Sequence, residues 1–143
     1  MKCQNKSLIP AWVYKGRIVK NHDDLLPECT DIVYLITYTD GKRYIGKRAV
    51  RSLRRKPPLK GKKRNRIVLT NLPFQKYVGS HEAKTAEILS REILYQCSYR
   101  KSSTYVETAL LFEFDAIADP MFLNENILGK FFARDVIGIL DND

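Results

Sequence analysis

The sequence predicts an α/β domain of the α+β kind, in which a small, mainly antiparallel three-stranded sheet is flanked by helices. Two segments of alternating apolar residues, 33–36 and 44–47, flank the turn Asp40-Gly41 and predict a β-hairpin. Residues 92–97 predict a third strand, and residues 104–117 repeat apolar positions at helical spacing. At 143 residues the chain is expected to form one domain with a real core.

Residues 1–30 are expected to be an N-terminal extension, with a small hairpin around Gly16 and a helical turn or loop over 22–27. The main domain, 31–143, begins with strands over 31–39 and 42–48 and carries a basic insertion at 47–66. Pro57-Pro58 and Gly61 interrupt regular structure, so the insertion is predicted to be a loop with a short helix over 50–56. Residues 82–89 are a helix candidate.

The clearest helix prediction covers residues 104–117. Its apolar face is formed by Val106, Ala109, Leu110, Phe114 and Ile117. The hydroxyls of residues 102–104 are candidate N-caps, and Pro120 is expected to stop the helix. Residues 121–124 are predicted to return to the sheet, and residues 127–140 to form a final helix.

The charge of the chain is concentrated in one segment. The net charge is +9, but residues 47–66 alone carry eleven cations and no Asp or Glu, which leaves about −2 for the rest. These cations are Lys47, Arg48, Arg51, Arg54, Arg55, Lys56, Lys60, Lys62, Lys63, Arg64 and Arg66. A near-neutral globule with one basic patch is typical of a nucleic-acid-binding protein. A nuclear address or a solvated loop is the alternative interpretation.

The cysteines and the apolar segments indicate the compartment. Cys3, Cys29 and Cys97 match no zinc-site spacing, and their odd number predicts reduced thiols in the cytoplasm. The start of the chain does not have the pattern of a secretory signal, and no apolar run approaches membrane-spanning length. No membrane association is expected.

Several short motifs resemble the GIY-YIG nuclease family. They are Ile32-Val33-Tyr34, then Tyr44-Ile45-Gly46, a downstream arginine, a helical glutamate and a later asparagine. The form VYLIT…DGKRYIGK, followed by a basic insertion and KYVGS, is similar to the Seg-type branch found in tailed phages. The resemblance covers roughly residues 12–125. Ile32 stands where the family has its first glycine, which is a backbone feature, so the chemistry is expected to survive.

The resemblance implies a metal-dependent DNA endonuclease that hydrolyses phosphodiester bonds. It would be phage-encoded, homing-type or DNA-degrading, and would act in the cytoplasm of a bacterial host with Mg²⁺ or Mn²⁺ as cofactor. A double-strand break would require a homodimer, or two separate binding and nicking events by a monomer. The alternative is a non-catalytic, basic nucleic-acid-binding module that kept the fold. RNA and branched DNA remain open as substrates.

The resemblance also assigns roles to two tyrosines. Tyr34 or Tyr44 would orient and deprotonate the attacking water. A phenol with a pKa of about 10 is a poor base unless neighbouring cations lower its pKa, and Lys47 and Arg48 are expected to do so. The alternative is that both tyrosines are ordinary strand residues.

Three further residues complete the implied catalytic set. Arg54, ten residues after Tyr44, would stabilise the transition state, although the basic residues around it leave that register open. Glu107 would bind the metal, unless Thr104-x-x-Glu107 is a helix capping box. Asn124 would hold the site or bind the scissile phosphate, unless it is a turn residue.

The remaining cations are expected to bind substrate. As a loop, residues 47–66 would contact the DNA backbone without reading its sequence. The residues assigned to this role are Lys47, Arg48, Arg51, Arg55, Lys62, Lys63 and Arg64.

Overall fold

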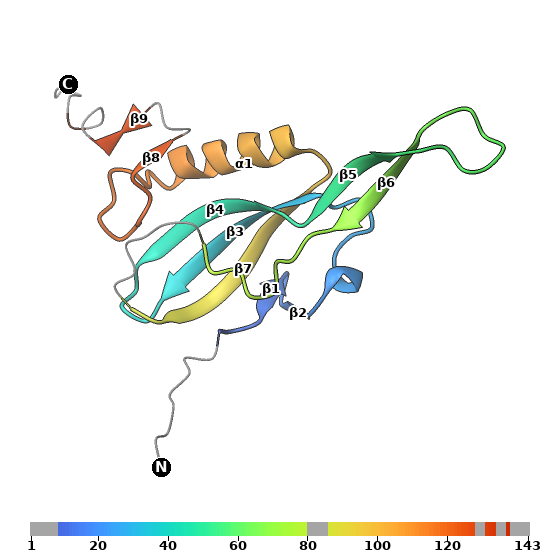
Figure 1. Cartoon of the computed structure of the whole chain (residues 1–143). Helices are drawn as coiled ribbons and strands as arrows, with labels where there is room; N and C mark the ends of the chain where they lie inside the picture. Colours follow the sequence, from blue (N-terminus) through green and yellow to red (C-terminus); the bar gives the residue numbers. More distant parts are fainter. Residues whose placement is uncertain (1–8, 80–85, 128–130, 134–136, 138–143) are drawn as a thin grey trace, which may run out of the picture.

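A computed structural model describes residues 9–79, 86–127, 131–133 and 137 (Figure 1). The fold is mixed α+β, as predicted, but the main sheet has five strands instead of three, in the order β2-β1-β7-β3-β4. The described part of the chain contains one complete α-helix, α1, where several flanking helices were predicted. The strands of this sheet are β1 (Trp12–Tyr14), β2 (Arg17–Val19), β3 (Asp31–Tyr38), β4 (Arg43–Ala49) and β7 (Ile88–Cys97).

The central hairpin forms as predicted, with β3 and β4 antiparallel and Tyr34 opposite Gly46. Strand β3 is covered on both faces, because its side chains alternate between two cores. Ile32, Tyr34, Ile36 and Tyr38 enter the core that also holds Trp12 and Phe74. On the opposite face, Val33 of β3 and Ile45 of β4 pack against the helix residues Leu110 and Leu111.

The predicted hairpin around Gly16 is present, but it is not separate from the main domain. Strand β1 pairs in parallel with β7, and β2 is the outer edge of the same sheet. The buried Trp12 explains this attachment, since its ring packs in the core and its Nε1 donates to the carbonyl of Phe74 at 3.0 Å. After β2, His22–Asp24 form a single 3₁₀ turn, η1.

Helix α1 (Arg100–Glu113) starts and ends earlier than the predicted range of 104–117. Its N-cap is Tyr99, and no side chain caps it, so the hydroxyls of residues 102–104 do not act as caps. The helix ends because Asp115 has a φ of 51°, a left-handed conformation that reverses the chain before Pro120 is reached. The Ala116 amide then donates to the carbonyl of Leu111 at 2.9 Å.

The basic insertion is a β-hairpin, so the prediction of a loop with a short helix was wrong. Strands β5 (Arg51–Lys56) and β6 (Arg66–Asn71) form a separate antiparallel sheet that projects from the body as an arm (Figure 1). The run of Ile67, Val68 and Leu69 supplies strand-forming residues opposite the cations of β5. Pro57 and Pro58 end the first strand, and Gly61, with a φ of +84°, lies in the connecting turn.

Strand β7 begins at Ile88, four residues before the predicted start of the third strand at residue 92, and it pairs with β3 along its whole length. The helix candidate 82–89 was therefore wrong at Ile88 and Leu89, and its first four residues lie outside the described chain. Residues 72–79, between the arm and β7, cover one face of the sheet through the buried Phe74 and the half-buried Tyr77.

Residues 121–124 return to the sheet as predicted and run beside the outer edge of β4. The Arg43 amide donates to the Met121 carbonyl at 2.7 Å, and the Leu123 amide donates to the Arg43 carbonyl at 2.8 Å. Two short strands follow, β8 (Asn126–Ile127) and β9 (Phe131–Phe132). Ile127 and Phe131–Phe132 were predicted to be helical and are not. Ala133 and Ile137 are helical, and the rest of the predicted tail helix lies outside the described residues.

Candidate active site

Gly46 allows the side chain of Tyr34 to lie directly over the backbone of β4. The two residues are paired across the hairpin, and β4 is the edge strand of the sheet. A Cβ built on Gly46 would lie 2.4 Å from the Tyr34 hydroxyl oxygen and 2.6 Å from its Cζ. A side chain at this position would therefore displace the tyrosine, so the glycine is required for packing.

Three aromatic rings surround Tyr34 and fix its position. Trp12 meets it edge-on with ring centroids 5.4 Å apart, Tyr77 does so at 5.7 Å, and Tyr44 lies tilted at 6.3 Å. The Tyr34 hydroxyl donates to the Tyr77 hydroxyl at 3.3 Å. Tyr44 is more exposed than the buried Tyr34. Two phenols from adjacent strands thus lie together, one inside the core and one at its surface.

The expectation that nearby cations lower the tyrosine pKa was wrong for Tyr34. Burial raises its pKa far above the ordinary value, and Tyr77, Tyr44 and the charge of Glu107 raise it further. The cations of the basic insertion do not reverse this, because most of them lie on the arm. Tyr34 is therefore a hydrogen-bond donor in this structure and is not poised to lose its proton.

Glu107 and Lys47 face each other on the α1 side of the hairpin. The Lys47 ammonium donates a short hydrogen bond to the Thr104 hydroxyl, which lies one helical turn before Glu107. Burial raises the pKa of Glu107, and the charge of Lys47 acts in the opposite direction. Thr104 lies inside the helix and its hydroxyl donates to the Arg100 carbonyl at 3.1 Å, so the capping-box interpretation of this pair was wrong.

Glu107 has the properties of a cation ligand. Its side chain is half-buried, and the positive charge of Lys47 acts on its carboxylate. The described residues contain no group of three or more His, Cys, Asp or Glu side chains that could enclose a metal. A single carboxylate is nevertheless enough for Mg²⁺, which keeps several waters and takes further oxygens from substrate phosphates. The residues present fit such a metal.

Arg48 lies beside the tyrosine cluster. Its guanidinium lies 4.4 Å from the centre of the Tyr77 ring, and its Nη2 donates weakly to the Pro73 carbonyl at 3.4 Å. The Nε atom is buried and has no hydrogen-bond partner among the described residues. A surface pocket of about 440 Å³ adjoins this guanidinium, lined by Arg48, Pro73, Phe74, Gln75, Lys76 and Tyr77.

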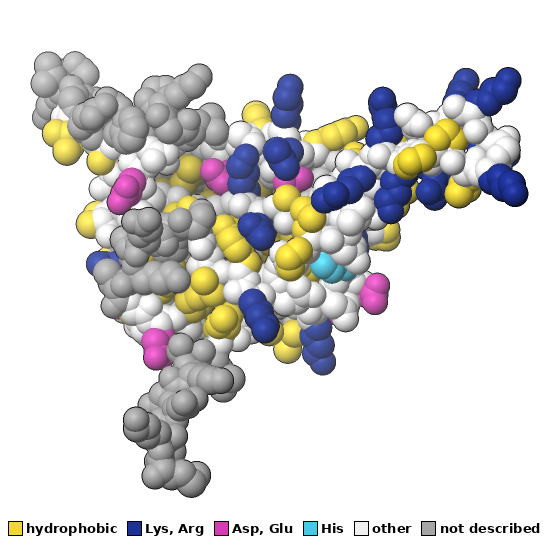
Figure 2. Space-filling view, in the orientation of Figure 1, with side chains coloured by type: hydrophobic (Ala, Val, Ile, Leu, Met, Phe, Trp, Pro, Cys, Tyr) yellow, Lys and Arg dark blue, Asp and Glu magenta, His cyan; other side chains and the backbone are white. Residues whose placement is uncertain are grey.

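Arg54, which the resemblance placed in the catalytic set, lies on the arm instead. Its Nε donates to the Ser52 hydroxyl at 3.3 Å, and its side chain is exposed. Figure 2 shows dark-blue side chains gathered along the arm, away from the body of the sheet. The exposed cations there include four assigned to substrate binding: Arg55, Lys62, Lys63 and Arg64.

Arg51 was also assigned to substrate binding, but its guanidinium is engaged within the protein. It donates to the carbonyls of His22 and Leu26 at 2.7 Å, and to those of Pro27 and Cys29 at 3.2 and 3.1 Å. These bonds join the base of β5 to the segment before β3. Arg51 therefore supports the arm and is not available to a ligand in this structure.

Asn124 binds the edge of β4 through both groups of its amide. Its Oδ1 accepts from the Ile45 amide at 3.0 Å, and its Nδ2 donates to the Ile45 carbonyl at 2.8 Å. The side chain thus continues the ladder beside the strand that carries Tyr44 and Gly46. In this structure the asparagine positions the hairpin, and it is not an isolated turn residue.

Sequence reasoning missed two residues that shape the site. Arg91 is buried on β7, where its guanidinium lies 4.5 Å from the centre of the Trp12 ring and donates to the Tyr77 carbonyl at 2.7 Å. Burial lowers its pKa to about 10. His22, to which the sequence assigned no role, bridges the carbonyls of Val50 and Leu72 at the base of the arm. No local sequence signal identifies either contact.

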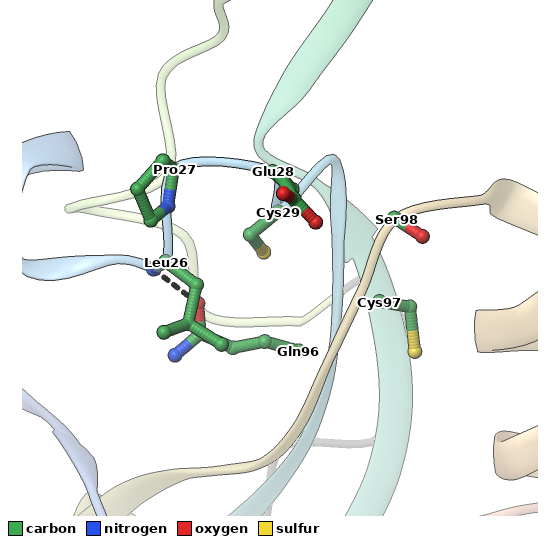
Figure 3. Close-up of a pocket in the computed structure, with 7 residues that line it drawn as sticks. All are labelled: Leu26, Pro27, Glu28, Cys29, Gln96, Cys97 and Ser98. Atoms are coloured by element: carbon green, nitrogen blue, oxygen red, sulfur yellow. Dashed lines mark hydrogen bonds between the residues drawn. The ribbon is translucent and has the colours of Figure 1, made fainter.

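A cavity of about 370 Å³ lies elsewhere, between the segment before β3 and the end of β7 (Figure 3). Its lining residues are Leu26, Pro27, Glu28, Cys29, Gln96, Cys97 and Ser98, with the Leu26 amide donating to Gln96 Oε1 at 2.8 Å. Burial raises the pKa of Cys29 to about 11 and also raises that of Cys97, so neither thiol is an activated nucleophile. This cavity contains none of the tyrosine cluster.

The family model described as "Putative endonuclease segE, GIY-YIG domain" matches residues 12–127, which include every strand of the main sheet, the arm and α1. The chain belongs to the GIY-YIG family. The match is to an endonuclease domain, so it supports a nuclease that acts on DNA. No curated protein and no solved structure is similar enough to the chain to match it.

This GIY-YIG domain departs from the family motif at Ile32. Ile32, which replaces the first glycine of the family motif, is fully buried in the core with Trp12, so at this position the chain packs a side chain where the motif has none. None of the described helices is long and apolar enough to cross a membrane.

Proposed function

We propose that this protein is a phage-encoded, Mg²⁺-dependent DNA endonuclease whose active site lies at the Gly46 edge of β4. The observation that carries the proposal is the convergence of Tyr34 and Tyr44 from one face of the hairpin with Glu107 and Lys47 from the other. Glu107 lies close enough for its charge to raise the pKa of Tyr34, although the two residues are far apart in sequence. The Seg-type resemblance supports the phage origin.

Glu107 holds the metal in this proposal. A bound Mg²⁺ or Mn²⁺ supplies Lewis-acid chemistry at a phosphoryl oxygen. Lys47 lies beside the carboxylate and also adds positive charge where a phosphate would approach. The half-buried environment strengthens these interactions, because it replaces water with fixed groups of the protein.

The two tyrosines have different roles. Tyr34 is buried and donates its hydroxyl hydrogen to Tyr77, so it anchors the cluster and orients its neighbours. Tyr44 is the more exposed phenol and lies tilted against Tyr34, so it orients the attacking water. Asn124 holds the intervening strand through Ile45 and acts as a positioning residue.

Cleavage of supercoiled plasmid tests the proposal directly. We expect the wild-type protein to nick the plasmid in Mg²⁺ and to leave it intact in EDTA, because the metal is needed to neutralise charge on the phosphate. Gel mobility in EDTA measures binding at the same time. A plasmid that is bound but never cut, with or without metal, would instead support a non-catalytic binding module.

Arg48 and Arg54 provide a matched pair that locates the catalytic arginine. Arg48→Gln is expected to lower the cleavage rate on the order of a hundred- to a thousandfold, because its guanidinium adjoins the tyrosine cluster. Arg54→Gln is expected to weaken DNA binding and to reduce the salt dependence by about one phosphate contact, with little change in the rate at saturating DNA. Single-turnover cleavage rates and thermal unfolding of both variants are the measurements. Equal rate losses would place Arg54 in the site as well.

A further inference from the structure

The arm formed by β5 and β6 presents a long surface that packs against nothing in the described structure. Every residue from 53 to 67 is exposed. Each strand has six residues, so the paired region is roughly 20 Å long at about 3.3 Å per residue. An isolated two-stranded ribbon is marginal in water, so a projection of this kind is expected to act against a partner.

The base of the arm is held firmly. His22 bridges the carbonyls of Val50 and Leu72 at 2.9 and 2.8 Å, and the Leu72 amide donates to the Val50 carbonyl at 2.9 Å. Arg51 ties the first residue of β5 to four carbonyls of the neighbouring segment. The ribbon is therefore presented in a defined direction, which lowers the entropic cost of docking it.

The arm has two chemically different faces. Cross-strand partners share a face, so Leu53 with Leu69, and then Ile67 with Arg55, lie on one side. Leu53, Leu69 and Ile67 are 59%, 40% and 70% exposed, so no described part of the chain covers these apolar side chains. The opposite face carries the cations Arg54, Lys56 and Arg66, together with Val68, which pairs with Arg54.

The charge of the arm identifies its partner. Between residues 53 and 67 there are eight cations and no Asp or Glu. They are Arg54, Arg55, Lys56, Lys60, Lys62, Lys63, Arg64 and Arg66. A second copy of the same arm would be repelled, since lysines and arginines on an open strand oppose edge-to-edge pairing. A polyanion that also exposes apolar groups between its charges would contact both the cationic face and the apolar face of the arm.

We propose that the arm is a two-stranded β-ribbon that enters the major groove of B-form duplex DNA beside the cleavage site. The inference rests on DNA being the substrate, as in the proposed function. The major groove is wide enough for such a ribbon, and its floor exposes thymine methyl groups to apolar side chains. The cations then contact the phosphates on both sides of the groove. The deep, narrow major groove of A-form RNA excludes the same ribbon.

Binding and chemical footprinting in EDTA test the arm without requiring cleavage. The full chain is compared with the arm variant Leu53→Ser/Ile67→Ser/Leu69→Ser, on duplex and single-stranded DNA of the same sequence. A control variant, Ile18→Ser/Leu26→Ser/Leu89→Ser, removes three apolar side chains of similar exposure from other parts of the surface. Dimethyl sulfate reports access to guanine N7 in the major groove, and thermal unfolding verifies that all three proteins fold.

We expect the wild type and the control to prefer duplex DNA and to protect guanine N7 over part of the bound site. The arm variant should bind duplex at least about tenfold more weakly and lose that protection, because it loses apolar burial against the bases. Equal affinity and protection for the arm variant and the control would overturn the inference, as would equal binding of single strands and duplex. Intact N7 protection by a protein that never cuts in Mg²⁺ would support the arm and overturn the nuclease proposal.

Discussion

Glu107→Gln is expected to lower DNA cleavage roughly a thousandfold while DNA binding stays unchanged. The amide keeps the size of the side chain but removes the charge that would hold the metal. A metal contributes several kcal/mol to transition-state stabilisation, and each 1.36 kcal/mol is a tenfold change in rate. Binding survives because the cations of the arm are unaffected.

The same substitution should raise the thermal stability of the metal-free protein. Burial raises the pKa of Glu107 in the folded state, so the ionised carboxylate is unfavourable in the fold. Wild type therefore gains stability relative to Glu107→Gln as the pH falls through this raised pKa. The Tm advantage of the variant should be largest at mildly alkaline pH and vanish below the ordinary glutamate pKa of about 4.3. Mg²⁺ should raise the Tm of wild type and should not raise that of Glu107→Gln.

Glu113→Gln is the matched control, because Glu113 is exposed at the end of the same helix. It should change neither the cleavage rate nor the response of the Tm to Mg²⁺. A Glu107→Gln protein that still cuts at the wild-type rate would remove Glu107 from the metal site. If Glu113→Gln were the inactive variant, the metal would have to be reassigned to the helix end.

Gly46→Ala is expected to destabilise the protein by about 1–3 kcal/mol, the usual cost of overpacking a core. The added Cβ would lie 2.4 Å from the Tyr34 hydroxyl oxygen, and Tyr34 cannot retreat because Trp12 and Tyr77 pack against it. Any displacement of the ring would also disturb the tyrosine cluster, so cleavage should fall together with stability. Chemical denaturation and plasmid nicking measure the two effects.

A double-mutant cycle with Tyr34→Phe tests the cause. Removing the hydroxyl relieves the closest contact, but the ring carbon Cζ would still lie 2.6 Å from the new Cβ. The double variant should therefore recover part, and not all, of the stability lost in Gly46→Ala. Strictly additive losses would mean that the alanine acts through the backbone and not through Tyr34.

The sequence predicted best where the signals are local. The β3–β4 hairpin follows from alternating apolar residues and an Asp-Gly turn, and the helix from apolar spacing at 106–117. Its C-terminal boundary shifted because Asp115 adopts a left-handed conformation that no sequence pattern specified. The arm was missed because eleven cations obscured the strand pattern of Ile67, Val68 and Leu69.

The contacts that decide chemistry were less accessible to sequence reasoning. Spacing from Tyr44 favoured Arg54, but the insertion folds as a projecting hairpin and carries Arg54 away from the tyrosines. Arg48 lies beside Tyr77 because alternate residues of β4 share the face of Tyr44 and Gly46. The direction of the Tyr34 pKa shift depends on burial among rings from three separate segments.

By itself the sequence determined the family, the central hairpin, the concentration of positive charge and the residue types available for catalysis. Each of these depends on neighbouring residues or on a motif that can be read along the chain. Only the tertiary structure decided that β1 pairs with β7 and that Arg51 supports the arm. It also decided that the charge of Glu107 raises the pKa of Tyr34. These depend on contacts between distant segments, where burial and packing geometry, and not local propensity, set the free energy.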